Sequence, residues 1–305
     1  MVTASLVKEL REKTNAGMLD CKKALEESQG NFEAAVEWLR KKGLSSAAKK
    51  ADRLAAEGLV AAALYQGKTG ALVEVNSETD FVARNEQFQK LVQEIAHHIA
   101  AHPHSADSVA SLLDQSFQGG AKIGERLKEA IAKIGENLLV RRFVRFSTSG
   151  YVHTYVHGEG KIAVMVELSA PANHEAIKNF AHDMCLHIAA MNPISLSAEE
   201  MPKDVLDKER EILKAKNLEQ GKKPEMVDKI VEGQIKKFLA ESVLLEQSFV
   251  KNPDLKVKDN LSQACKASGV TFTLLRFQRF ELGEGLQKRS QNFAEEVAAQ
   301  TQGLN

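Results

Sequence analysis

The sequence predicts an α+β fold in which helices and antiparallel sheets occupy separate stretches of the chain. The main observation is an internal repeat with a period of roughly 90 residues, each copy being two strands joined by a glycine turn and followed by an amphipathic helix. The second observation is helical periodicity before, between and after the two copies. At 305 residues, the chain is also too long for a single typical core.

Residues 1–43 predict a three-helix N-terminal module, with breaks at Asn15–Gly17 and Gln29–Asn31 and a last helix that ends near Gly43. Residues 44–57 are expected to form a linker. The basic stretch 40–53 is interpreted as a solvated linker helix rather than an RNA contact, because the chain carries no net positive charge.

The two copies of the repeat predict two similar core subdomains. The first spans residues 58–148, and the second is split into 149–200 and 244–284. In each, a helix follows the strand hairpin, and a third strand arrives later in the chain, at Leu138–Phe146 in the first and Val270–Leu282 in the second.

An insertion at residues 201–243 separates the parts of the second subdomain. Two apolar stripes on either side of a short turn at Gly221 predict an antiparallel helical hairpin. Such an arm buries little surface alone, so a partner or a second copy is expected. Residues 285–305 predict a C-terminal helical module, with a helix from Leu286 to about Gln300.

Composition disfavours several function classes. Lys and Arg total 41, as do Asp and Glu, so the net charge is zero and a general nucleic-acid binder is disfavoured. The three cysteines lie far apart, which disfavours zinc and dithiol sites and is typical of a reducing cytoplasm. With no apolar run of membrane length and no signal peptide, a cytoplasmic location is expected.

No motif predicts catalysis, a metal ligand or a cofactor. Gly67-Lys68-Thr69 resembles the end of a phosphate-binding loop, but Ala62 stands where that loop requires glycine. The nine histidines lack catalytic or metal-binding spacing. We therefore expect a protein that is not an enzyme.

One segment is unusual for a junction between a strand and a helix. The strand Leu72–Val75 runs into Asn76–Asn85, where Phe81 stands shortly before a helix that starts near Glu86. Phe81 is either a hydrophobic staple, with Thr79 or Asp80 helping to cap the helix, or an aromatic wedge for a protein partner. The residues alone leave both interpretations open.

Several motifs together resemble the elongation factor Ts family over nearly the whole chain. They are Asn76-x-Glu78-Thr79-Asp80-Phe81-Val82-Ala83, the run Leu10–Leu25, Lys133-Ile134-Gly135-Glu136-Asn137, Arg276-Phe277 with Gly283-Glu284-Gly285, and Phe293-Ala294-x-Glu296-Val297-Ala298. Leu19 stands where many members carry methionine, a conservative apolar exchange. The turn His157-Gly158 matches, whereas the following Glu159-Gly160 departs from the family pattern.

The resemblance implies a ubiquitin-associated-like N-terminal module and a duplicated core that together bind an elongation factor Tu-like GTPase. It implies release of GDP through the nucleotide-free state of that partner, with Thr79, Asp80, Phe81 and Val82 dislodging its magnesium ion. Further partner contacts are implied at Arg11, Met18, Leu19, Ile134, Gly135 and His157. The hairpin 201–243 corresponds to an arm through which some members form homodimers. No cofactor, direct nucleic-acid contact or membrane contact is expected.

Two alternatives remain open at the level of sequence. One is an RNA-binding or ribosome-associated module that uses Arg141, Arg142 and Arg145 with the linker lysines. The other is a purely structural dimer built on the helical arm.

Overall fold

The computed structural model describes residues 2–14, 16–104, 106–117 and 120–286, without the side chains of 44–48. The expected C-terminal helix after Leu286, and with it the matched run Phe293–Ala298, lies outside the described residues. Within them, the α+β class predicted from the sequence is confirmed.

The N-terminal module consists of α1 (Ala4–Thr14), α2 (Met18–Glu27) and the first half of α3 (Phe32–Lys50). It has a small core of its own, which includes Leu10, Cys21 and Leu25. The predicted end of the third helix at Gly43 is wrong, because α3 continues to Lys50. Gly43 lies where α3 packs against α7 (Ile123–Ile134), and a Cβ built on it would lie 3.0 Å from the Cβ of Ala132. Tertiary packing therefore outweighs the weak helix propensity of glycine.

Two three-stranded antiparallel sheets form the centre of the molecule. The first contains β1 (Glu57–Tyr65), β2 (Thr69–Ser77) and β3 (Leu138–Ser147), and the second β4 (Tyr151–His157), β5 (Ile162–Leu168) and β8 (Leu274–Glu281). Both third strands predicted from the sequence are confirmed. Each joins its sheet beside the second strand of the hairpin.

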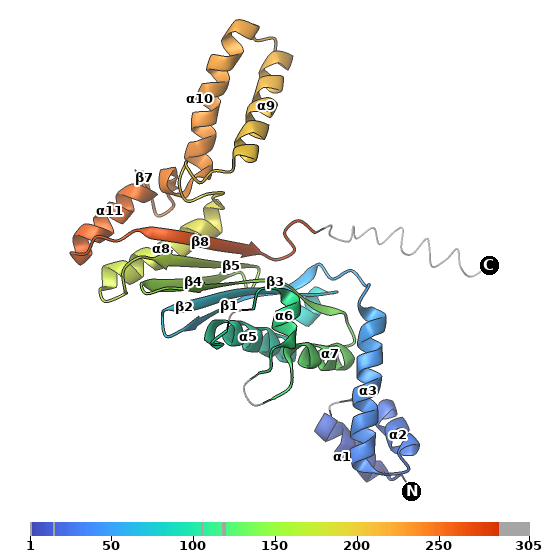
Figure 1. Ribbon diagram of the computed structural model, residues 1–305. Helices are drawn as coiled ribbons and strands as arrows, with labels where there is room; N and C mark the ends of the chain where they lie inside the picture. Colours follow the sequence, from blue (N-terminus) through green and yellow to red (C-terminus); the bar gives the residue numbers. More distant parts are fainter. Residues whose placement is uncertain (1, 15, 105, 118–119, 287–305) are drawn as a thin grey trace.

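The sheets face one another, and helices cover their outer faces (Figure 1). The first sheet is covered by α5 (Glu86–Ala101), with α7 and the short α6 (Val109–Asp114) beside it, and the second by α8 (Glu175–Met191), against which α11 (Val257–Ser268) packs. Before α11, the chain forms a 3-10 turn at Leu244–Glu246 and a small hairpin of β6 (Ser248–Phe249) and β7 (Asn252–Lys256). The layer between the sheets is apolar and includes Val60, Leu72, Phe146, Val152, Met165 and Phe280.

The two halves of the core contact one another reciprocally. The Val60 N–H donates to the Gly160 carbonyl at 2.8 Å, and the Val152 N–H donates to the Gly67 carbonyl at 3.1 Å. Each half thus places the turn of its hairpin against the first strand of the other. The repeat in the sequence is therefore expressed as an approximate twofold arrangement in space.

Ion pairs repeat this reciprocity. Glu74 on β2 accepts from Arg142 on β3 at 2.6 Å, and Glu167 on β5 accepts from Arg276 on β8 at 2.5 Å. The Arg142 guanidinium stacks on Phe280 at 4.3 Å, whereas that of Arg276 stacks on Phe146 at 4.0 Å. Each half therefore covers the arginine of the other with an aromatic ring.

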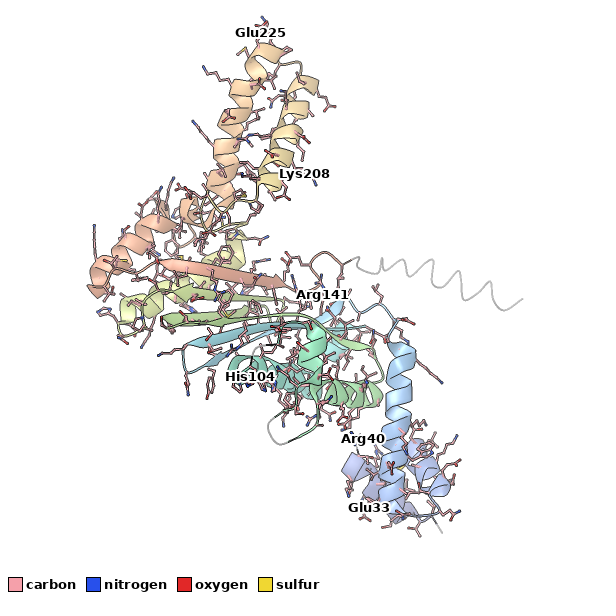
Figure 2. All side chains as sticks on the ribbon, viewed as in Figure 1. Glu33, Arg40, His104, Arg141, Lys208 and Glu225 are labelled. Carbon is pink, nitrogen blue, oxygen red and sulfur yellow. The ribbon has the colours of Figure 1, made fainter. Side chains whose placement is uncertain are left out.

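The helical hairpin, α9 (Lys203–Glu219) and α10 (Pro224–Ser242), extends away from the sheets, with Glu225 near its tip (Figure 2). Its two stripes pack on one another around Val227, Val231 and Ile235, and the buried Asn217 amide donates to Gln234 at 2.7 Å. The two stripes cover each other only in part, since Ile212 and Met226 remain 51% and 57% exposed. A homodimer through 201–243 stays a prediction.

Candidate protein-binding site

The segment from Asn76 to Asn85, called here the corner, connects β2 to α5. A single helical turn, α4 (Asp80–Ala83), interrupts it. The Asn85 side chain caps α5 by accepting from the N–H groups of Gln87 and Phe88. The expectation that Thr79 or Asp80 caps this helix is therefore wrong, because the intervening turn places both residues too early in the chain.

Phe81 projects from the corner with 77% of its surface exposed. The hydrophobic-staple interpretation is wrong, since a staple would be covered by the first turn of the helix. Val82 and Ala83, the next two residues, are buried in the core of the first half. Val82 and Ala83 thus anchor the corner in the core, while the ring of Phe81 stays in solvent.

A turn far away in the sequence supports the corner. The Glu136 carboxylate accepts from the Thr79 N–H at 3.0 Å and from the Thr79 hydroxyl at 2.6 Å. In the opposite direction, Glu78 accepts from the Asn137 N–H at 2.6 Å. The end of α7, Ile134 and Gly135, therefore lies beside the corner.

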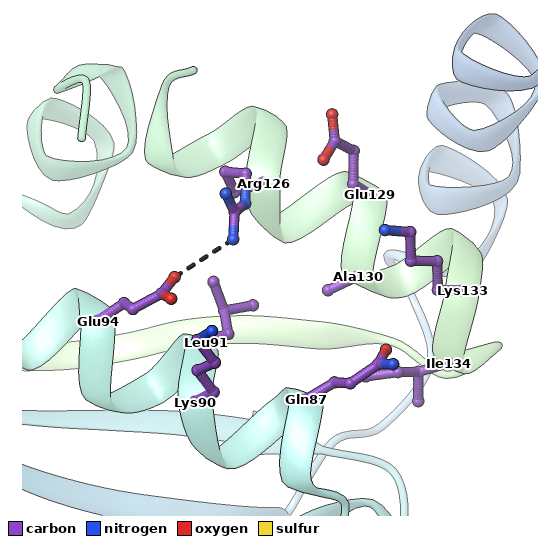
Figure 3. A pocket seen from close by; sticks show the side chains of 9 residues that line it. All are labelled: Gln87, Lys90, Leu91, Glu94, Arg126, Glu129, Ala130, Lys133 and Ile134. Carbon is purple, nitrogen blue, oxygen red and sulfur yellow. Dashed lines mark hydrogen bonds and ion pairs between the residues drawn. The ribbon is translucent and has the colours of Figure 1, made fainter. Parts of the chain in front are cut away.

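Gly135 ends α7 in the left-handed conformation, with φ at 90°, and it is exposed. Ile134, which is half-buried, lines one end of a groove of about 320 Å³ between α5 and α7 (Figure 3). Most other lining side chains are charged or polar, and Arg126 on α7 pairs with Glu94 on α5 at 3.2 Å. This mixed lining is typical of a protein-contact surface rather than of a pocket for a small apolar ligand.

The N-terminal module presents a second exposed patch. Leu19 and Met18, at the start of α2, are 82% and 48% exposed, and Arg11 on α1 is exposed as well. The module is joined to the core along α3, where Arg40 pairs with Glu125 at the start of α7 at 3.1 Å. Helix α7 therefore contacts the module along its length and ends beside the corner.

His157 lies at the end of β4 and is exposed, with its Nδ1 2.9 Å from the Tyr155 hydroxyl. In the turn that follows, Gly158, Glu159 and Gly160 all adopt positive φ. The next residue, Lys161, pairs with Glu57 at 3.5 Å, and Glu57 is opposite Ser77 at the end of β2. The His157 turn and the corner therefore lie at the same end of the first sheet.

The residues predicted from the sequence thus form three exposed patches and one anchor. Arg11, Met18 and Leu19 form the first patch, the corner with Ile134 and Gly135 the second, and His157 the third, whereas Val82 is buried.

Glu78, Glu136 and Asn137 were not recognised as functional residues. They stood inside the matched motifs, but a single sequence does not reveal that loops 57 and 59 residues apart bond to each other.

The described residues contain no cluster of three acidic, histidine or cysteine side chains arranged to hold a metal ion. None of the helices within the described ranges has the length and apolarity needed to cross a membrane. Burial raises the pKa of the Cys21 thiol, as it does that of Cys185, so both behave as packing residues.

Comparisons with known proteins identify the family of the chain. A family model described as Elongation factor TS matches residues 78–284, which include most of the corner and the end of α7. Elongation factor Ts of Bdellovibrio bacteriovorus is 55% identical over 308 residues, covering 99% of each chain. Elongation factor Ts of Clostridioides difficile is 48% identical over 300 residues, covering 98% of each, and that of Clostridium acetobutylicum is 46% identical over 305 residues, covering 99% of each. With its motifs, its duplicated core and these relatives, the chain belongs to the elongation factor Ts family.

Proposed function

We propose that this protein promotes release of GDP from an elongation factor Tu-like GTPase by binding the nucleotide-free state of that partner. The observation that carries the proposal is Phe81, an exposed aromatic ring on a corner whose neighbours are buried on one side and hydrogen-bonded on the other. An exposed ring on a rigid support is the kind of residue that dominates protein–protein binding energy. The protein accordingly acts by binding and not by a covalent step.

The mechanism follows from the electrostatics of phosphate sites. Magnesium and backbone amides hold the phosphates of a bound nucleotide. Phe81 inserts where the partner's magnesium and phosphate ligands are positioned. Insertion of Phe81 and binding of nucleotide to the partner therefore oppose each other, and the magnesium ion is dislodged. Thr79 and Asp80 shape the corner, and Val82 anchors it to the core.

Thermodynamic linkage sets the difference in binding free energy that the surface of this protein has to supply. A factor that weakens nucleotide binding a thousandfold has its own binding weakened by nucleotide to the same extent, which corresponds to ~4 kcal/mol. One desolvated aromatic ring, together with a few rearranged hydrogen bonds, is of that order. Phe81 therefore suffices as the principal source of the coupling.

The other exposed patches extend the interface. We place Arg11, Met18 and Leu19 on the nucleotide-binding domain of the partner. Ile134, Gly135 and His157 make further contacts. This division is supported by the position of α7, which contacts the N-terminal module and ends beside the corner.

The structure disfavours the RNA-binding alternative. Arg141 and Arg142 pair with the fully buried Glu74, and Arg142 also pairs with Glu284. Arg145 is half-buried, and its guanidinium donates to the His102 carbonyl at 3.4 Å. Arginines engaged in this way are poorly available to phosphates.

The decisive measurement is the rate at which fluorescent GDP leaves an elongation factor Tu-like GTPase as the protein is added. We expect strong acceleration by the natural sequence, and a saturating rate lower by at least about tenfold for Phe81→Ala, since one lost anchor costs roughly 1.4 kcal/mol or more. Because Phe81 is exposed, the variant should unfold at the same temperature. Equal affinity for the loaded and the empty GTPase would refute the proposal.

A further inference from the structure

The corner and the turn at the end of α7 are joined by two crossed carboxylates, which we call the carboxylate clamp (Glu78 and Glu136). Glu136 belongs to the turn and accepts two hydrogen bonds from Thr79 of the corner, at 3.0 and 2.6 Å. Glu78 belongs to the corner and accepts one from the Asn137 N–H of the turn, at 2.6 Å. Each loop therefore supplies the acceptor that the backbone of the other requires.

The clamp also includes the segment between α3 and β1. The buried Asn137 amide donates to the carbonyls of Ala51 and Arg53, at 3.2 and 2.8 Å. The Arg53 guanidinium returns to Glu78 at 3.4 Å. Three loops from distant parts of the chain thus meet next to Phe81.

Helix α4 is too short to fix the direction of Phe81 without this support. It has only four residues, and an isolated helical turn is not stable in water. Thr79 occupies its N-cap position, yet its side chain makes no capping bond. Instead, both the N–H and the hydroxyl of Thr79 are directed to Glu136, so the turn is tied across the chain and not capped locally.

We infer that Glu136 is a positioning residue for Phe81, and that Glu78 is its reciprocal partner, which holds Gly135 and Asn137 in register with the corner. The inference rests on the proposed function, because it assigns these carboxylates a role in presenting the wedge. Charged acceptors bonded to backbone N–H groups are among the stronger hydrogen bonds of proteins. These hydrogen bonds pre-organise Phe81, so that little conformational entropy is lost when the partner binds.

Loss of the clamp has a kinetic signature that differs from loss of binding surface. The exposed patches on the N-terminal module and at His157 do not depend on Glu136, so the concentration of factor for half-maximal exchange should change little. A mobile Phe81 inserts less often in the productive direction. We expect Glu136→Ala to lower the saturating rate of GDP release about tenfold, equivalent to ~1.4 kcal/mol.

Graded variants test the hydrogen bonds individually. Glu136→Gln keeps one carbonyl oxygen as an acceptor for Thr79 and should retain an intermediate rate. Thr79→Val removes the hydroxyl donor but keeps the N–H, and it should also be intermediate. Glu175→Gln, an exposed carboxylate in the first turn of α8, is the matched control and should behave as the natural sequence does.

A double variant separates positioning from general destabilisation. When Phe81 is already alanine, adding Glu136→Ala should lower the saturating rate little further, because there is no ring left to position. An equal tenfold loss in that background would overturn the inference, as would a folded Glu136→Ala protein with an unchanged saturating rate. Failure of the natural sequence to accelerate GDP release would instead refute the proposed function.

Discussion

At the scale of single residues, Leu19 and Phe81 are the two most exposed large apolar side chains among the described residues, at 82% and 77%. Phe81, Leu19 and Met18 are apolar, yet they lie on the surface, while Val82 beside Phe81 is buried. The sequence alone allowed both a staple and a wedge for Phe81, because residue type does not determine which side of a turn faces solvent. The inserted turn α4 and the carboxylate clamp direct Phe81 toward solvent, and both depend on contacts between distant loops.

A separate cluster of rings on β4 and α8 gives the protein a titrating group. His153 is hydrogen-bonded through Nδ1 to the Tyr151 hydroxyl at 3.1 Å and through Nε2 to His182 Nδ1 at 3.3 Å. The Tyr155 ring packs edge-on against His182, and the Cys185 thiol donates to the His153 carbonyl. Burial, and secondarily the neighbouring His182, lower the pKa of His153 to about 4.

This shift predicts loss of stability in acid. The pKa of His153 in the folded protein lies below the usual 6.5, so the unfolded chain binds the proton more tightly. The contribution of neutral His153 is complete above about pH 6.5, and it is lost as the pH falls toward about 4. Urea unfolding at a series of pH values should show the decline, with a shallower slope for His153→Asn. An identical slope in that variant would contradict the assignment.

At the scale of elements, the sequence predicted the strands better than the ends of the helices. Both strand hairpins and both third strands carried alternating or continuous apolar residues between turn signals, and these are local features. The end of α3 was missed because Gly43 is a helix breaker only where nothing packs on it. Helix α7 carries Ile123, Leu127 and Ile131 at helical spacing, so its existence is readable from the sequence, whereas its contact with α3 is not.

The contact between α3 and α7 predicts a role for Gly43 in holding the N-terminal module. A valine there brings its Cβ within 3.0 Å of the Ala132 Cβ, closer than two such carbons normally approach, so Gly43→Val should push the helices apart. Trp38 on α3 is the single tryptophan of the chain and reports directly on the module. We expect faster decay of Trp38 fluorescence anisotropy in Gly43→Val than in the natural sequence, because the module gains independent motion.

Gly233 on α10 supplies the matched control for that substitution. It is also a glycine within a helix, but a Cβ built on it meets no atom within 4 Å. Gly233→Val should therefore leave the anisotropy decay of Trp38 unchanged. An equal effect of both substitutions would refute the role of the close contact with Ala132.

At the scale of the whole molecule, Glu74 connects the first half to the end of the second. It is completely buried and accepts from Arg141 at 2.9 Å, Arg142 at 2.6 Å and the Gly283 N–H at 2.9 Å. Burial by itself raises the pKa of Glu74, but the bonds from Gly283, Arg141 and Arg142 outweigh it and lower the pKa below the usual value. The carboxylate is therefore charged in the folded protein.

Glu74→Gln should accordingly destabilise the protein by on the order of 3 kcal/mol, because it leaves the partly buried Arg141 without its counter-charge and Arg142 paired only with the more exposed Glu284. Glu167→Gln is the matched control, since Glu167 occupies the equivalent place in the other half but, within the described part of the chain, pairs with Arg276 alone. We expect its effect on the free energy of unfolding in denaturant to be smaller. A larger effect from Glu167→Gln would refute the view that Glu74 is the main connection.

The reciprocal contacts between the halves have an evolutionary consequence. Since each half covers the arginine of the other and bonds to its first strand, a single half would present a self-complementary surface, as the subunits of a symmetric dimer do. The core is therefore what a tandem gene fusion of two such subunits would produce. Two copies joined in this way can differ from one another, and here one bears the aromatic corner while the other accommodates the long helical insertion.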